Sequence, residues 1–147
     1  MTFWLVSKSI LLFVLAATIF LPLVASNPQG FYYESGLVSC EPNAGATYVD
    51  GYLYAGTQPV SGDFVAFAAN PNGPAVARIQ AGPHAGYQGW NPGFFSHILS
   101  ATGPRAGSWF FWVENEAGNR ISVIAPLTTT ASADPGGCQQ AHIYFRK

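Results

Sequence analysis

Short runs of alternating apolar and polar residues, separated by turn-forming residues, fill the chain after residue 45. Each run is rich in aromatic and β-branched side chains and ends near Gly, Pro, Asn or Asp, which is typical of a β-strand. Seven strands are predicted in this way: Tyr48–Ala55, Asp63–Ala69, Ala75–Gln80, Gly93–Ser100, Ser108–Asn115, Arg120–Ala125 and Ala141–Arg146. About seven short strands at this spacing predict an all-β fold, a single antiparallel β-sandwich, over residues 46–147.

A different pattern opens the chain. The run Ile10–Ala25 is apolar and uncharged, Lys8 precedes it, and small residues follow at Val24-Ala25-Ser26. This arrangement predicts a hydrophobic helix that sends the rest of the chain out of the cytoplasm. Two interpretations stay open: a cleaved signal peptide over residues 1–26, or an uncleaved membrane anchor through residues 3–25. The protein is then extracytoplasmic, either secreted or anchored at the outer face of the cytoplasmic membrane, with residues 27–45 as a linker and first strand region.

The chain has only two cysteines, Cys40 and Cys138, and they bracket most of the exported part. An even cysteine count in an exported chain favours a disulfide. Closing a loop of about 100 residues contributes about 4–5 kcal/mol in the chain-entropy model. A metal site at these cysteines is excluded by their separation, because they lack the short spacing of zinc ligands.

The strand Ser108–Asn115 has aromatic residues on both faces, because successive side chains point to opposite sides of a strand. Trp109 and Phe111 share one face, and Phe110 and Trp112 share the other. One face belongs to the core of the sandwich. The other is covered by segments of the same chain or, if it is exposed, provides a platform for a partner.

Two parts of the chain resemble a known family of sandwich domains. The sequence Gly51-Tyr52-Leu53-Tyr54, followed by Gln58-Pro59-Val60-Ser61-Gly62, is similar to the opening of Ig-like or carboxypeptidase-regulatory-like (transthyretin-like) domains of secreted bacterial proteins. Two later strands and the turn Glu116-Ala117-Gly118-Asn119 are similar to their second half. The resemblance implies a β-sandwich that serves as a spacer, an adhesive module or an accessory binding unit, without catalysis.

The charge of the chain and the absence of known catalytic or metal-binding motifs argue against several classes of function. Seven acidic and six basic residues give a net charge of −1, and charged residues make up 9% of the chain, against about 25% in an average soluble protein. This composition lacks the basic stripe of a nucleic-acid-binding protein. The three histidines, His84, His97 and His142, have no metal-ligand spacing, and the nucleophile motif G-x-S-x-G is absent. We therefore expect no enzyme activity, no metal and no cofactor.

The best candidate for a recognition surface is the loop Gly82–Gly93. Its candidate binding residues combine aromatic rings with uncharged hydrogen-bonding groups: His84, Tyr87, Gln88, Trp90 and Asn91. In the alternative interpretation, Trp90 only caps the end of the core. A second candidate is the row formed by Tyr48, Tyr52 and Tyr54, which share one strand face with Asp50.

Two functions follow from this sequence. The first is a non-enzymatic module for protein–protein interaction or self-association in the cell envelope, for example an accessory subunit of a membrane-associated complex. Low charge, many aromatic residues and the membrane-anchor interpretation of the N-terminal segment favour it. The alternative is a carbohydrate-binding module that uses the exposed tyrosine and tryptophan residues, with a polysaccharide as its ligand.

Overall fold

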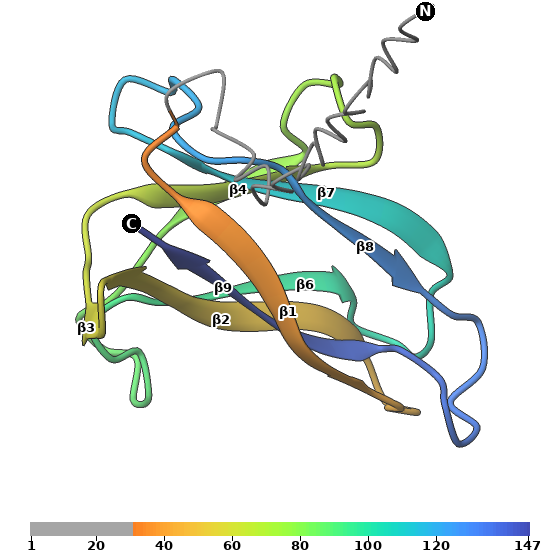
Figure 1. Cartoon of the computed structure of the whole chain (residues 1–147). Coiled ribbons are helices and arrows are strands. Elements are labelled where there is room, and N and C mark those ends of the chain that lie inside the picture. Colours follow the sequence, from red (N-terminus) through yellow and green to blue (C-terminus); the bar gives the residue numbers. More distant parts are fainter. Residues whose placement is uncertain (1–30) are drawn as a thin grey trace, which may run out of the picture.

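The computed structural model describes residues 31–147, and this part of the chain is all-β. Its strands are β1 (Glu34–Glu41), β2 (Thr47–Ala55), β3 (Gln58–Pro59), β4 (Phe64–Ala68), β5 (Ala77–Gln80), β6 (Phe94–Ser100), β7 (Gly107–Glu114), β8 (Ala125–Thr129) and β9 (Gln140–Arg146). They form two layers that face each other, as Figure 1 shows. The predicted all-β fold is confirmed, and six of the seven predicted strands coincide with observed ones over most of their length.

The strands divide into two sheets of different topology. Sheet I, the lower layer in Figure 1, has the order β1-β9-β2-β3, and β6 also pairs with β2. Sheet II has the order β5-β4-β7-β8. The pair β2–β9 is parallel, so the prediction of a purely antiparallel sandwich is wrong at this place. These strands lie far apart in the sequence, and the long connection between them permits a parallel pair.

The core lies between the two sheets and follows the alternation of each strand. In β2, Val49 and Leu53 are fully buried, while the tyrosines on the opposite face are partly exposed. Phe95, Phe111 and Phe145 bring fully buried rings to the centre from β6, β7 and β9. Burying an aromatic side chain of this kind contributes about 1.5–3 kcal/mol each, so these rings hold the sheets together.

The predicted strand Arg120–Ala125 is wrong. This segment makes only isolated bridges, at Arg120 and Ser122, and the strand at the edge of sheet II begins at Ala125. The cause is the Ser122 hydroxyl group, which accepts the Val113 N–H at 2.7 Å in place of a backbone carbonyl. Pro126 lies within the real strand β8, and a proline is tolerated there because β8 is an edge strand.

The predicted disulfide between Cys40 and Cys138 is confirmed, with the two Cα atoms 5.1 Å apart. It joins β1 to the residues that lead into β9, across 98 positions of the sequence. A structural disulfide of this kind is typical of an oxidising, extracytoplasmic compartment.

The predicted N-terminal hydrophobic helix, interpreted as a signal peptide or as a membrane anchor, lies outside the described residues. Within residues 31–147, no helix has the length and apolar character needed to span a membrane.

Candidate functional site

The outer face of sheet I carries a ladder of aromatic and polar side chains. Parallel pairing sets the side chains of β2 and β9 opposite each other in the same register. The pairs that point away from the core are Tyr48 with Gln140, Asp50 with His142, Tyr52 with Tyr144, and Tyr54 with Arg146. We call these eight residues the tyrosine face. Cross-strand neighbours at this spacing touch, so the face is one continuous surface.

A hollow of about 400 Å³ lies on the tyrosine face. The rings of Tyr52, Tyr54 and Tyr144 line it, Asp50 and His142 lie among its walls, and Arg146 also borders it. Val38 of β1 and the strand segments at Gly51 and Ile143 complete the lining. Such a hollow offers apolar ring surfaces and hydrogen-bonding groups to one small ligand.

A glycine on the neighbouring strand allows one of these rings to lie flat over it. Gly36 of β1 pairs with Tyr144 of β9. A Cβ atom at Gly36 would lie 2.5 Å from ring atoms of Tyr144, which is too close for any real side chain. The position of the Tyr144 ring on the tyrosine face therefore depends on the absence of a side chain at Gly36.

Asp50 and His142 form a hydrogen-bonded pair in the middle of the face, with Nδ1 of His142 donating to Oδ1 of Asp50. Burial raises the pKa of Asp50, and the attraction of His142 partly opposes this rise. The pKa of Tyr48 is also raised, first by burial and then by the nearby charges of Asp50 and Glu41. Asp50 is thus a partly buried acceptor whose orientation is fixed by His142.

The same register places Ser39 of β1 opposite His142, which puts a serine, a histidine and an aspartate in line across three strands. However, Nε2 of His142 accepts a hydrogen bond from the Gln140 side chain at 3.2 Å. No hydrogen bond joins Ser39 to His142 within residues 31–147, although a nucleophile and its base need that contact. Ser39, His142 and Asp50 therefore do not form an assembled triad within residues 31–147. The described residues also hold no cluster of three or more metal-ligating side chains.

Ring contacts connect the tyrosine face to the predicted recognition loop. The Trp90 ring lies 5.2 Å from the Phe94 ring, and Phe94 lies 5.4 Å from Tyr52, centroid to centroid. Tyr52 continues the series to Tyr54 at 6.0 Å, and His84 packs on Trp90 at 4.7 Å. We call this series of five residues the aromatic band. In Figure 1 the loop that carries His84 and Trp90 (green) projects below sheet I, near β3.

The structure therefore brings together some of the predicted site residues and not others. His84, Trp90, Tyr52 and Tyr54 belong to the aromatic band, and Tyr87 packs beside Trp90 at 6.1 Å. Gln88 and Asn91 are exposed in the same loop. Their side chains make no hydrogen bond within residues 31–147, so they are free to contact a ligand.

Phe110 and Trp112 lie on sheet II, on the opposite side of the molecule from the tyrosine face. Trp112 is only 7% exposed and packs against Ala66 and Ala68. Its Nε1 donates a hydrogen bond to Glu114 at 2.7 Å. Of the two alternatives for this pair of rings, the structure favours coverage by the same chain for Trp112, which is buried on the outer face of its sheet, while Phe110 is partly exposed.

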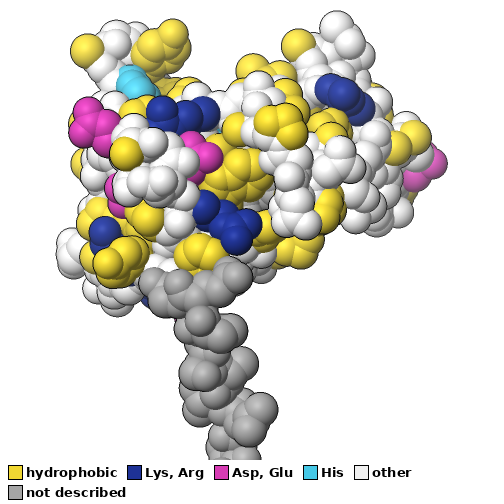
Figure 2. All heavy atoms as spheres, turned by 90° about the horizontal axis from the view of Figure 1, so that it is seen from above, with side chains coloured by type: hydrophobic (Ala, Val, Ile, Leu, Met, Phe, Trp, Pro, Cys, Tyr) yellow, Lys and Arg dark blue, Asp and Glu magenta, His cyan; other side chains and the backbone are white. Residues whose placement is uncertain are grey.

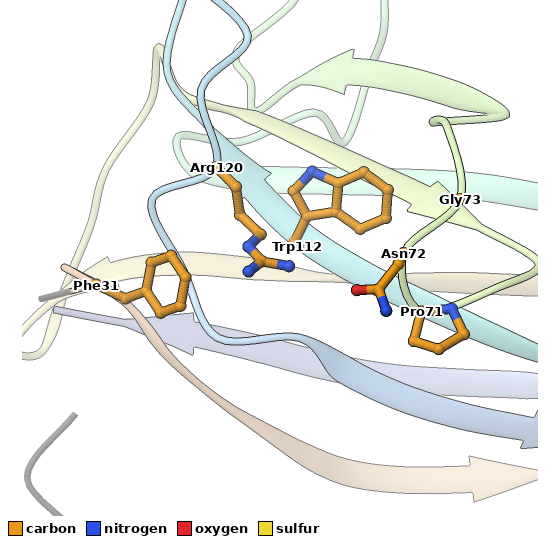
Figure 3. A pocket seen from close by; sticks show the side chains of 6 residues that line it. All are labelled: Phe31, Pro71, Asn72, Gly73, Trp112 and Arg120. Carbon is orange, nitrogen blue, oxygen red and sulfur yellow. The ribbon is translucent and has the colours of Figure 1, made fainter. Parts of the chain in front are cut away.

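A hollow of about 430 Å³ lies next to Trp112. Figure 2 shows this side of the molecule, with cationic side chains around a central depression that contains apolar atoms. In Figure 3 the Arg120 guanidinium lies between Phe31 and Trp112, and it stacks 4.8 Å from the Phe31 ring.

Sequence reasoning missed the half of the tyrosine face that β9 contributes. In β9, outward-facing residues alternate with buried ones: His142, Tyr144 and Arg146 point outward, and Ala141, Ile143 and Phe145 point into the core. This alternation was the signal in the sequence that could have revealed the outward face of β9. The position of these residues beside β2 depends on a parallel pairing between distant segments, which the alternation of either strand does not reveal.

Comparisons with known proteins identify no relative of this chain: no family model, no curated protein and no solved structure matches it. The functional assignment therefore depends on the geometry and chemistry of the tyrosine face.

Proposed function

We propose that this chain is a non-enzymatic, extracytoplasmic β-sandwich module that binds carbohydrate on its tyrosine face. The observation that carries the proposal is the alternation of aromatic rings with hydrogen-bonding side chains around one open hollow. The resemblance to Ig-like and carboxypeptidase-regulatory-like domains supports a role without catalysis. The disulfide supports a location outside the cytoplasm, where the protein is secreted or anchored to the membrane.

Sugar chemistry fits this surface. A pyranose ring has an apolar face of C–H groups and a rim of hydroxyl groups. The rings of Tyr52, Tyr54 and Tyr144 offer large apolar surfaces with few rotatable bonds, so little conformational entropy is lost when they stack on a ligand. Asp50 accepts hydrogen bonds from hydroxyl groups, and Arg146 donates them.

The aromatic band indicates a ligand longer than one sugar. It continues from the hollow over Phe94 to Trp90 and His84, which come from a different part of the chain. A single pyranose contacts only part of such a surface. An oligosaccharide contacts the hollow and the band together, and each additional ring adds a stacking contact.

The test is a calorimetric titration of the full chain with neutral hexasaccharides of glucose, mannose and N-acetylglucosamine. We expect at least one of them to bind, and we expect Tyr52→Ala to weaken that binding by about tenfold or more, as for a central aromatic contact. Tyr32→Ala is the matched control, because Tyr32 is 70% exposed and lies outside the tyrosine face. Binding of none of the three sugars, or equal losses in both variants, would contradict the proposal.

A second candidate function is association with a protein partner or with a second copy. It is favoured by the edge strand β1, where the adjacent residues Leu37 and Val38 are 56% and 68% exposed. Exposed apolar edge strands are common sites of strand addition. An assembly that persists without any saccharide and is lost in Leu37→Lys would support this candidate.

A further inference from the structure

A third hollow lies on the side of the sandwich where the edges of the two sheets are formed by β5 and β6. It is a groove of about 720 Å³. The exposed side chains of Val76 and Ile98 stand on its two rims. Phe67, Leu99 and Trp109 of the core form apolar parts of its lining. The groove is therefore an opening through which solvent reaches apolar core residues, and such openings are typical of ligand sites.

The groove lies between the edges of the two sheets. At one end they are joined, because the Gly82 N–H donates to Phe94 O at 2.7 Å and the Gly93 N–H donates to Gly82 O at 3.0 Å. Tyr87 and Trp90 of the recognition loop stand at this closed end. At the other end lie Val76 and Arg105. The groove is thus elongated, with an aromatic end and a cationic end.

The imidazole of His97 inside the groove is hydrogen bonded to the protein itself. His97 reaches across from β6 to β4, where its Nε2 lies 2.8 Å from Val65 O. Its ring packs on Phe67 at 4.9 Å, and burial lowers the pKa of His97, which keeps the ring neutral. The middle of the groove therefore offers mostly apolar contacts and no charge.

Arg105 is the only charged residue among those that line the groove, because His97 is neutral. Its guanidinium stacks 4.8 Å from the Trp109 ring and donates one hydrogen bond to Leu99 O at 2.6 Å. Within residues 31–147, none of the ion pairs involves Arg105. A guanidinium has five N–H donors, so Arg105 keeps donors and a full charge available for an anion.

We propose that this groove binds an unbranched aliphatic chain with an anionic end, as in a fatty acid, and that the anion contacts Arg105. The chain lies along the apolar lining, and its free end points toward Tyr87 and Trp90. Arg105 supplies the charge complementarity that selects an anionic amphiphile over a neutral one. The groove shares Trp90 and Phe94 with the aromatic band, but Arg105 and Trp109 lie outside the hollow of the tyrosine face.

The geometry argues against a peptide strand as the occupant. A strand that pairs with both edges needs the two edges about 10 Å apart over several residues, since each ladder spans about 4.8 Å. Here the segment that follows β5 is hydrogen bonded to β6 at one end, through Gly82 and Phe94. A flexible aliphatic chain has no such spacing requirement.

The test is calorimetric titration of the full chain, purified without detergent, with dodecanoate and with dodecan-1-ol. We expect dodecanoate to bind, and Ala77→Trp to weaken this binding by about tenfold or more because it fills the groove. Ala75→Trp is the matched control, since Ala75 is a nearby exposed alanine that does not line the groove. Arg105→Gln should weaken dodecanoate by about fivefold or more and leave dodecan-1-ol within about twofold.

Several results would overturn the proposal. One is the absence of dodecanoate binding by the wild-type chain, and another is an equal loss in Ala75→Trp and Ala77→Trp. A third is equal weakening of dodecanoate and dodecan-1-ol by Arg105→Gln. If Ala77→Trp does not fold, Ile98→Ser replaces it, because Ile98 is 69% exposed and stands on the rim. A wild-type dimer that dodecanoate does not dissociate would assign the groove to a second copy.

Discussion

Tyr33 shows how a single polar atom is accommodated beside the core. Its ring is fully buried, and its hydroxyl group donates a hydrogen bond to Oδ2 of Asp63 at 2.8 Å. Lys147 lies over the ring and 3.8 Å from the same carboxylate. Burial raises the pKa of Tyr33 well above its ordinary value, and Asp63 raises it further. The folded state thus holds this proton more tightly than the unfolded chain does.

This difference predicts a loss of stability at alkaline pH. The contribution of Tyr33 is complete below the pKa of an unfolded tyrosine, about 10, and it declines as the pH rises above that value. We expect Tyr33→Phe to lower the free energy of unfolding by ~1 kcal/mol at pH 7 and to reduce its decline above a pH of about 10. Urea denaturation of both proteins across this pH range measures the effect. If the free energy of unfolding declines equally with pH in wild type and variant, Tyr33 does not cause the loss of stability at alkaline pH.

At the scale of the element, alternation within a strand was predictable and pairing between strands was not. The sequence predicts that Tyr52, Tyr54 and Asp50 share a face, because this depends only on the twofold period of one strand. It does not reveal that β9 enters between β1 and β2, which requires contacts between distant segments. The displaced strand at Arg120–Ala125 has a local cause, since the Ser122 hydroxyl replaces a backbone acceptor. Residues 27–45 were assigned only as a linker and first strand region, and they contain β1.

The contact between β1 and β9 yields a prediction about the binding face. In Gly36→Ala, the added Cβ atom would lie 2.5 Å from the Tyr144 ring, so we expect the ring to shift away from the hollow. Carbohydrate affinity should fall by about tenfold, as for loss of one aromatic contact, while the fold is kept because the end of a flexible side chain can move. The matched control is Gly45→Ala, whose nearest neighbour lies at an ordinary 3.5 Å. Calorimetric titration measures both variants, and unchanged affinity in Gly36→Ala would show that the Tyr144 ring is not a contact.

At the scale of the whole molecule, the low charge and the arrangement of the two sheets together determine which surfaces the protein presents. Charged residues are only 9% of the chain, and the outer face of sheet I combines tyrosine and amide side chains with Asp50, His142 and Arg146. The disulfide and the fully buried rings hold this face in a fixed geometry. Sheet I then offers an open aromatic face with one hydrogen-bonded Asp50–His142 pair, and the side between β5 and β6 offers an apolar groove. A sandwich of this kind presents two chemically different surfaces on one fold.

This composition predicts that carbohydrate binding depends little on salt. Salt screens interactions between exposed charges, and raising NaCl from about 0.05 M to about 1 M shortens the Debye length severalfold. The contacts proposed for the tyrosine face are ring stacking and hydrogen bonds, and its acid Asp50 is already paired with His142. We therefore expect the dissociation constant for a neutral hexasaccharide to change by less than about twofold over this range, while Arg105-dependent binding of dodecanoate should weaken. Calorimetric titrations of both ligands at the two salt concentrations measure the difference. A carbohydrate affinity that falls by about tenfold with salt would indicate a charged ligand and would exclude neutral sugars as the main ligand of the tyrosine face.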